Sequence, residues 1–276
     1  MNLSGFLHAW RVGMAACALA WFGPAELRAD TRVALGPVQT IQRSAEPFGL
    51  AASPLDGGGL TEKWLGVQRR LDDELVQLAL CDGDRDGCVS PAALKFLAII
   101  DAAKLRDGRA RLGEVNRAVN LAIRPVSDLV QYGQADVWTS PLATLAKGGG
   151  DCEDYAIAKF VALRLAGIAP DDLRIVIMHD TIRGEDHAVA AARLDGRWLT
   201  LDNNRMAMIE DINVRNYRPT FLIDQHAVMR YADPAQFADA TGRHVYGLKP
   251  ASPLVVSSLA EPGQIAPANE APAQAD

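Results

Sequence analysis

The sequence lacks the residues on which several protein classes depend. It has only four cysteines among 276 residues, too few for a scaffold built from disulfides. It has no run of basic residues and carries a net charge of −6, so we do not expect non-specific binding to nucleic acid. Only one stretch, at the N-terminus, is apolar enough to approach a membrane. The content of 49% hydrophobic and 22% charged residues is typical of a globular protein and excludes a wholly disordered chain, a collagen and a coiled coil.

The N-terminal apolar stretch has the pattern of an export signal. Arg11 precedes an apolar run over 12–23, which is shorter than the ~20 residues that a membrane-spanning helix needs. The small residues that follow predict cleavage after Ala29, and cleavage after Ala25 is the alternative. We therefore predict a signal peptide over 1–29, export to the periplasm of a cell with two membranes, and no stable membrane insertion after cleavage. An uncleaved membrane anchor is the alternative interpretation.

The rest of the chain divides into three predicted parts. Residues 30–59 are interrupted by prolines and glycines, which indicates an irregular leader with one short strand over 31–35 at most. Residues 60–249 carry the regular apolar patterns and are predicted to form the folded domain. Residues 250–276 are rich in Pro, Ala, Gln and Glu, which predicts a disordered tail.

Within the predicted domain, helical patterns come first and strand patterns second. This order favours an α+β fold over alternating βαβ units. The spacing of apolar residues predicts helices over 61–80, 91–104, 111–123 and 152–167. Segments rich in β-branched and apolar residues predict strands over 173–178, 187–194 and 197–201. The dipeptide Asp195-Gly196 predicts a hairpin between the last two strands, in which paired residue numbers add up to about 391.

Cys81 and Cys88 bracket an acidic stretch, Asp-Gly-Asp-Arg-Asp-Gly, that begins like an EF-hand calcium loop. The bidentate Glu of such a loop is replaced here by Ala93, which removes two oxygen ligands and one charge. We therefore favour an acidic turn closed by a disulfide, which export makes chemically reasonable.

Cys152 is the one thiol that remains when Cys17 leaves with the signal peptide and the other two cysteines pair. It follows the glycines of 148–150 and opens a predicted helix. The N-terminal end of a helix favours a thiolate, and its free N–H groups can receive an oxyanion. Cys152 is therefore the candidate nucleophile, and the alternative is a small buried cysteine that packs the helix.

A thiolate nucleophile needs a base, and the base needs an acceptor that orients it. His187 begins the second predicted strand, and the hairpin register places it near Asn204, two residues from Asp202. We therefore predict His187 as the base and Asp202 as the orienting acid. The alternatives are a core or surface histidine and an aspartate that only caps the end of a strand.

The motif Gly-Asp-Cys-Glu-Asp-Tyr at 150–155, together with His187 and the Leu-Asp-Asn at 201–203, resembles the bacterial transglutaminase-like cysteine proteinases. The likeness extends over about residues 60–225 and includes the segment 136–141 before the cysteine. It implies a papain-like, transglutaminase-like α+β core, with N-terminal helices packed on an antiparallel sheet and the nucleophile at a helix N-terminus. It also implies a catalytic triad of Cys152, His187 and Asp202.

The same resemblance implies an activity, a substrate and a partner. The activity is that of a periplasmic cysteine endopeptidase. The substrate is a large biofilm adhesin, cut near its N-terminus within a short motif that contains paired alanines. The partner is an inner-membrane receptor for cyclic di-GMP, which sequesters and thereby inhibits the protease.

A calcium site at Asp151 and Glu153 is also implied by the resemblance. Bare carboxylates beside Cys152 would raise the pKa of its thiol, and a bound Ca²⁺ would reverse that local field. Further candidate ligands are Asp154, Asn116 and Asn120. The alternative is that the acidic residues only complement the N-terminus of the helix.

Two other functions are compatible with the same residues. A transglutaminase-like acyltransferase or a cell-wall peptide amidase would form the same thioester as a protease. A non-catalytic binding module would keep the fold without the chemistry. Trp138 is predicted either to line the substrate cleft or to pack in the core.

Overall fold

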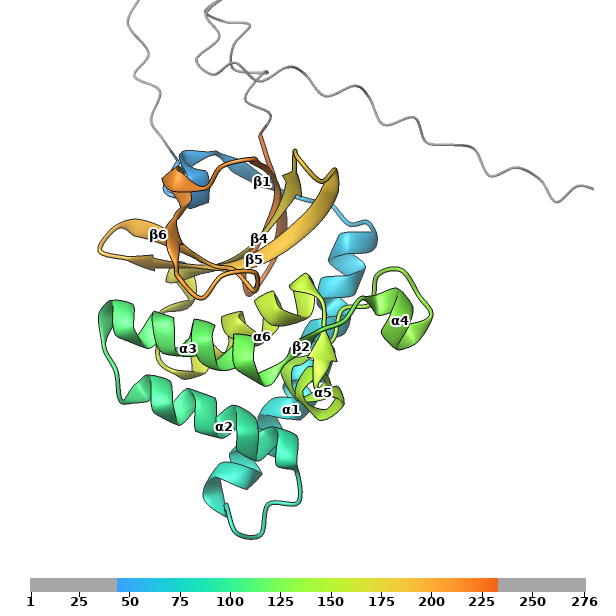
Figure 1. The fold of residues 1–276 in the computed structure, drawn as a ribbon, viewed down its shortest axis with the longest axis vertical. Coiled ribbons are helices and arrows are strands. Elements are labelled where there is room, and N and C mark those ends of the chain that lie inside the picture. The colour runs from blue at the N-terminus through green and yellow to red at the C-terminus, as the bar shows by residue number, and fades with distance from the viewer. Residues whose placement is uncertain (1–43, 233–276) are drawn as a thin grey trace, which may run out of the picture. The chain divides into compact units, whose positions relative to one another are not determined.

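The computed structural model describes residues 44–232 (Figure 1). The predicted signal peptide over 1–29, the predicted strand over 31–35 and the predicted tail over 250–276 lie outside the described residues. Within the described part, no helix is both long enough and apolar enough to cross a membrane.

The first half of the described chain is helical. Its helices are α1 (Gly59–Gly83), α2 (Pro91–Lys104), α3 (Gly108–Ala122), α4 (Asp128–Tyr132), α5 (Pro141–Lys147) and α6 (Cys152–Leu165). The start of α2 follows from its sequence, because Pro91 occupies the first turn and Ser90 Oγ accepts a hydrogen bond from the Ala93 N–H at 3.2 Å. The four longer helices confirm the four that the apolar spacing predicts.

The second half of the described chain and one strand that precedes the helices form an antiparallel sheet of seven strands, in the order β1-β9-β8-β4-β5-β6-β7. The strands are β1 (Ala52–Pro54), β4 (Leu173–Asp180), β5 (Glu185–Leu194), β6 (Arg197–Leu201), β7 (Ile209–Glu210), β8 (Tyr217–Ile223) and β9 (Val228–Tyr231). A separate parallel pair joins β2 (Arg124–Pro125) to β3 (Gly149–Gly150). Short 3₁₀ helices are η1 (Pro47–Gly49), η2 (Pro170–Asp172) and η3 (Asp211–Asn213).

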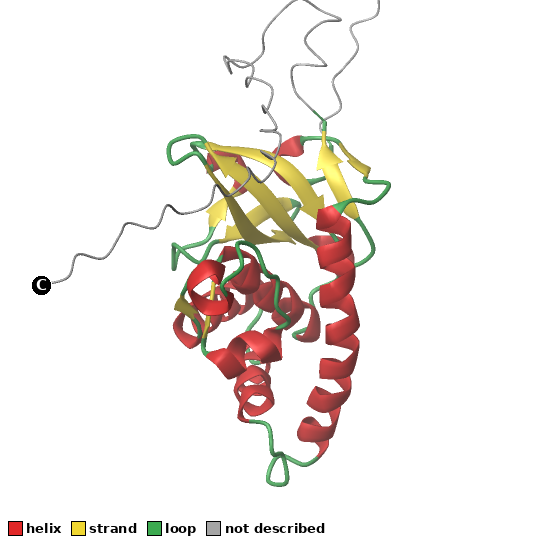
Figure 2. Cartoon of the chain, turned by 90° about the vertical axis from the view of Figure 1, so that its right-hand side faces the viewer, coloured by secondary structure: helices red, strands yellow, loops and turns green. Residues whose placement is uncertain are grey.

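Helix α6 is the centre of the fold. Every residue from Asp154 to Leu163 is buried, because α6 is enclosed by the sheet on one side and by other helices on the other. Figure 1 shows α3 and α6 below β4 and β5, and Figure 2 shows the long α1 running from the level of the sheet past the helical layer. The N-terminus of α6, where Cys152 lies, therefore sits where the two layers meet. This arrangement confirms the predicted α+β class, with helices packed on an antiparallel sheet.

The β5–β6 hairpin has the predicted register. Ala190 pairs with Leu201 and Leu194 pairs with Arg197, so the paired numbers add up as the Asp195-Gly196 turn requires. Asp195 and Gly196 both have positive φ, of 51° and 75°, which an Asp-Gly turn provides at low cost.

The described part of the predicted irregular leader is more regular than expected. Residues 52–54 form β1, which pairs antiparallel with β9 at the edge of the sheet. Upstream of β1, the carboxylate of Glu46 binds Arg174 at 2.8 and 2.9 Å, and Trp198 Nε1 donates to the carbonyl of Ala45 at 2.8 Å. The folded unit therefore begins before residue 60, because backbone pairing and these contacts attach the segment to the sheet.

The loop between α1 and α2 is closed by a disulfide between Cys81 and Cys88, as the sequence predicts. Within it, Asp84 Oδ1 accepts a hydrogen bond from the Gly87 N–H at 2.9 Å, so this carboxylate shapes the turn.

Replacing both cysteines by serine is expected to lower the free energy of unfolding by roughly 2 kcal/mol, because a short disulfide loop removes little entropy from the unfolded chain. Urea unfolding of the double variant against the parent measures this difference. Peptidase activity at 25 °C serves as the control and is expected to persist, since the loop contributes no residue to the site described below. A loss of activity in a variant that still folds would contradict this separation.

Candidate active site

Cys152 is the first residue of α6, and the glycines before it shape the turn that presents it. Gly148 has a φ of 67°, and Gly149 and Gly150 form β3. A Cβ on Gly150 would lie 2.5 Å from Asp154 Oδ2, so only glycine fits there while the Asp154 side chain keeps its place. Asp151 is the N-cap of α6 by position but makes no side-chain capping hydrogen bond. The first N–H groups of α6 therefore lack both intrahelical and capping partners.

His187 and Asp202 meet across the β5–β6 hairpin. His187 Nε2 lies 2.9 Å from Asp202 Oδ1, and both side chains are largely buried. Burial alone would raise the pKa of Asp202, but the hydrogen bond and charge of His187 and the Asn204 N–H hold it below its usual value. A carboxylate on Nε2 keeps the proton on that nitrogen and leaves Nδ1 as the free base.

Cys152 lies against the same strand. The backbone N–H of Ala188, the residue that follows His187, acts on the Cys152 thiol and partly offsets the rise in its pKa. The structure thus joins the predicted base directly to the predicted orienting acid and places the helix of the predicted nucleophile against the same strand, β5.

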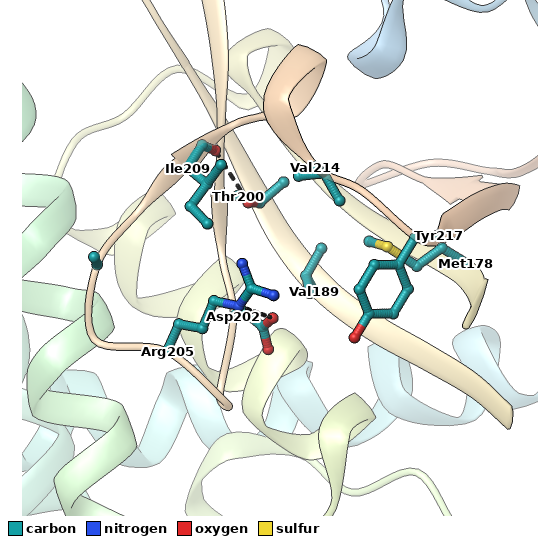
Figure 3. A pocket seen from close by; sticks show the side chains of 9 residues that line it. Met178, Val189, Thr200, Asp202, Arg205, Ile209, Val214 and Tyr217 are labelled. Carbon is teal, nitrogen blue, oxygen red and sulfur yellow. Dashed lines mark hydrogen bonds and ion pairs between the residues drawn. The ribbon is translucent and has the colours of Figure 1, made fainter. Parts of the chain in front are cut away.

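Two asparagines of α3 hold the loop that follows Asp202. Asn120 Nδ2 donates to the carbonyl of Asp202 at 3.0 Å, and Asn116 Nδ2 donates to the carbonyls of Arg205 and Met206 at 3.1 and 3.0 Å. Both asparagines were candidate calcium ligands, and these hydrogen bonds give them a role that needs no metal. Figure 3 shows Arg205 reaching over Asp202, with Tyr217 on the other side of the same small pocket.

The protein groups around Cys152 favour the thiol over the thiolate. Burial raises its pKa, and the carboxylate of Glu153, whose Oε2 lies 2.9 Å from the sulfur, raises it further. The partner of Glu153 is therefore the thiol, while its predicted role as a calcium ligand stays a prediction.

Three buried or half-buried aspartates gather beside the nucleophile. Asp128 begins α4, Asp151 precedes α6, and Asp154 lies in the first turn of α6. One carboxylate oxygen from each lies within 4.8 Å of the other two. Burial raises the pKa of all three, to about 9 for Asp151 and about 6 for Asp154. For Asp151 the charge of Glu153 adds to the burial effect.

This acidic group fits a hard cation. Asp154 Oδ1 accepts hydrogen bonds from the N–H and the hydroxyl of Thr139, at 2.8 and 2.6 Å, and the Val137 N–H donates to Asp128 Oδ2. The remaining oxygens, Asp154 Oδ2 and Asp128 Oδ1, are buried without a partner, as is Asp151 Oδ1. Unpartnered buried carboxylate oxygens are costly unless a cation neutralises them, and carboxylates are the ligands that Ca²⁺ prefers.

Lys159 is a charged residue near the candidate site that the sequence analysis did not identify. It lies two turns after Cys152 in α6, is fully buried, and donates from Nζ to the carbonyl of Leu201 at 3.1 Å. Since Leu201 precedes Asp202, this bond ties the helix of the nucleophile to the strand end that carries the acid. Burial lowers the pKa of Lys159 to about 7, an effect that the charge of Asp202 opposes.

The pKa of Lys159 predicts a distinct dependence of stability on pH. Between pH 7 and 10 the unfolded lysine keeps its proton while the folded one loses it, so the unfolded state binds more protons and stability rises with pH. The contribution is at most about 1.4 kcal/mol per pH unit. Urea unfolding at several pH values is expected to show this rise in the parent and its absence in Lys159→Met. The comparison of the two proteins cancels the contributions of other titrating groups to the pH dependence. Parallel curves of unfolding free energy against pH would contradict a lowered pKa for Lys159.

Trp138 packs in the core rather than lining the cleft. Its side chain is 5% exposed, and its carbonyl accepts a hydrogen bond from Arg70 Nη2 at 2.7 Å. Asp128 was missed by the sequence analysis, because nothing in its local pattern indicates that α4 folds back onto the start of α6.

Comparison with known proteins identifies one family. The sequence profile of the bacterial transglutaminase-like cysteine proteinases matches residues 78–229. A search among curated proteins found no significant match.

Among solved structures, Legionella pneumophila LapG is 22% identical over 59% of this chain and 92% of its own length, with a TM-score of 0.48. The calcium-bound form of that LapG is 24% identical over 50% of this chain and 77% of its own length, with a TM-score of 0.45. A putative cysteine protease from Cytophaga hutchinsonii is 14% identical over 50% of this chain and 52% of its own length, with a TM-score of 0.32.

The residues of the family motif, 150–155, fall within the matched region, as do His187 and Asp202. The profile match covers more than half of the sequence. The chain therefore belongs to the bacterial transglutaminase-like cysteine proteinases, and it is a cysteine peptidase with a transglutaminase-like α+β fold.

Proposed function

We propose that this cysteine peptidase is a calcium-dependent endopeptidase that works through Cys152, His187 and Asp202. The observation that carries the proposal is the 2.9 Å contact between His187 Nε2 and Asp202, formed beside a cysteine at a helix N-terminus. This is the arrangement that nucleophilic thiol catalysis needs: a nucleophile, a base and a group that orients the base.

The chemistry follows from the roles of the three side chains. His187 Nδ1 takes the proton from Cys152 Sγ, and the sulfur attacks the carbonyl carbon of the scissile peptide bond. The free N–H groups at the start of α6 stabilise the resulting oxyanion. His187 then gives its proton to the leaving amine, which leaves a thioester on Cys152. Finally, His187 takes a proton from a water molecule that hydrolyses this thioester.

Calcium would be held by Asp128, Asp151 and Asp154, each of which has one unpartnered buried oxygen. When bound, the cation supplies positive charge beside Cys152, which favours the thiolate over the thiol. Glu153 remains a candidate for the same site, because it lies two residues after Asp151 and contacts the sulfur of Cys152. Ca²⁺ takes six to eight oxygens, so carbonyls or water would complete the site.

The substrate, partner and compartment belong to the same proposal. The substrate is a large cell-surface adhesin of biofilms, cut near its N-terminus within a small-residue motif. An inner-membrane receptor for cyclic di-GMP is the inhibitory partner. The motif at 150–155 supports both. The predicted signal peptide and the disulfide of Cys81 and Cys88 support a periplasmic location, because disulfides persist in oxidising compartments.

The test is the mass of the products from an N-terminal adhesin fragment of the same organism. The fragment is incubated with the protein, with Cys152→Ala, and with the protein plus a chelator. Discrete cuts that need both Cys152 and calcium are the expected result. Products whose masses show transfer to an added amine instead of hydrolysis would favour the acyltransferase. A fragment that stays intact in every sample would exclude it as the substrate.

A further inference from the structure

A cationic hollow lies at the same end of the sheet as His187 and Asp202. It has a volume of about 240 Å³ and is built by three segments: the turn after β4, the loop after β6 and the residues before β8. Each segment contributes one arginine to its wall, Arg183, Arg205 and Arg215 respectively. Tyr217, the first residue of β8, also lines it. We call this hollow, defined by the three arginines and Tyr217, the arginine pocket.

The positive charge of the arginine pocket is only partly balanced. Asp180 is in its wall, but Asp180 Oδ1 already accepts hydrogen bonds from the Ile182 and Arg183 N–H groups, at 2.9 and 3.0 Å. Asp202 is engaged by His187, and Arg205 Nε stays 3.9 Å from Asp202 Oδ2.

The two outer arginines are the ones available to a ligand. Within the described residues, neither Arg183 nor Arg215 forms an ion pair, and the one side-chain hydrogen bond of Arg215 goes to the carbonyl of Ile212 at 3.1 Å. A carboxylate entering the pocket would meet Arg215, which forms no ion pair, and Arg183, whose charge acts on Asp180 without forming an ion pair with it.

Exposed apolar side chains accompany the arginines. Ile182 adjoins Arg183, Met206 adjoins Arg205, and Ile212 lies three residues before Arg215. Their exposed fractions are 74%, 55% and 58%. Arginine, methionine and large apolar groups together are typical of surfaces that bind polypeptides. The ligand best matched to this surface is therefore a peptide segment that combines acidic and apolar residues.

The arginine pocket adjoins the catalytic groups directly. The ring of Tyr217 packs on His187, with ring centroids 5.7 Å apart. Arg205 reaches over Asp202, as Figure 3 shows. A polypeptide whose scissile bond reaches Cys152 therefore runs close to the pocket.

We propose that the arginine pocket is a substrate subsite that binds acidic side chains flanking the scissile bond. This inference rests on the proposed function, because it assumes that a polypeptide is cut at Cys152. It adds a substrate class that the triad does not specify: segments with aspartate or glutamate beside the cleavage site.

The test measures binding and does not depend on turnover. The Cys152→Ala protein is titrated, in the presence of Ca²⁺, against short fluorescein-labelled peptides with a central Ala-Ala pair. The peptides differ only in flanking residues, which are glutamate, glutamine or lysine, and fluorescence anisotropy at low salt reports binding. The Glu peptide is expected to bind about tenfold more tightly than the Gln peptide, since two exposed ion pairs form.

Matched variants distinguish binding in the arginine pocket from a general effect of the protein's positive charge. Arg183→Gln with Arg215→Gln is expected to remove the preference for the Glu peptide. Arg69→Gln with Arg106→Gln removes the same charge from exposed positions on α1 and after α2, and is expected to keep the preference. Equal binding of the Glu and Gln peptides, or an equal loss in both double variants, would overturn the proposal. The proposal would also be overturned if inorganic phosphate, at equal ionic strength, abolished the parent's preference for the Glu peptide while the Arg183→Gln, Arg215→Gln variant kept that preference.

Cleavage of the same peptides by the protein with Cys152 intact is measured separately. If binding depends on Arg183 and Arg215 but no peptide is cut, the subsite stands and the endopeptidase proposal fails for these sequences. If all three peptides are cut with the same kcat/KM, the endopeptidase proposal stands and the subsite fails.

Discussion

Replacing Cys152 by alanine is expected to lower kcat/KM for peptide-bond cleavage by about 10⁴-fold or more, to the limit of detection. Without the sulfur no thioester forms, and neither His187 nor Asp202 can supply another nucleophile at the same place. Asp202→Asn is expected to cost up to about 10⁴-fold, because an amide can hold the imidazole in the wrong tautomer. Mass spectrometry of the products from an N-terminal adhesin fragment measures both losses.

The three side chains are expected to act as one unit. The double variant Cys152→Ala with His187→Ala should be no slower than Cys152→Ala alone, because each change already removes the covalent pathway. Thermal unfolding of each variant serves as the control for folding. A folded Cys152→Ala protein that keeps a tenth of the parent activity would show that another residue attacks the substrate.

After replacement of Cys152, removal of calcium is expected to have the next largest effect on cleavage. A chelator should abolish cleavage, and added Ca²⁺ in excess should restore it, because the buried carboxylates beside Cys152 otherwise disfavour the thiolate. Binding should also stabilise the fold. At a free concentration of about 100 times Kd the gain is ~2.7 kcal/mol, which corresponds to a rise in Tm of roughly 5–10 °C.

Asp128→Asn is the sharpest variant for this claim, because Asp128 is distant from the cysteine motif in the sequence. It keeps the shape of the side chain but removes a charge from the acidic group, so calorimetry should show weaker Ca²⁺ binding and a smaller rise in Tm. Asp73→Asn, at an exposed position of α1, is the matched control and should bind Ca²⁺ like the parent. Unchanged binding in Asp128→Asn would place the cation elsewhere, with Glu153 as the next ligand to replace.

Local patterns in the sequence predict most of the elements that carry the candidate site. The start of α2 follows from Ser90 and Pro91, and the pairing of β5 with β6 follows from the Asp-Gly turn, because both depend on neighbouring residues. The register of that turn places His187 near Asn204, close enough to Asp202 for the contact between them to be expected.

The remaining features depend on contacts between distant segments. β1 escaped prediction because Ala52–Pro54 is short and has no alternating apolar pattern, and its strand is defined by pairing with the distant β9. Asp128 and Lys159 could not be assigned to the site, since their roles depend on how α4 and β6 pack against α6. The sequence could indicate that Lys159 belongs to a helix, but not that its ammonium group ends at the carbonyl of Leu201.

The measurement that tests the central claim most directly is the alkylation rate of Cys152 by iodoacetamide at pH 7.5, followed by peptide mass mapping. It needs no substrate, and Cys81 and Cys88 do not react while they are joined in a disulfide. We predict rapid alkylation with Ca²⁺, and slow alkylation with a chelator or in His187→Asn. An equally slow rate in all three samples would contradict a thiol activated by His187 and calcium.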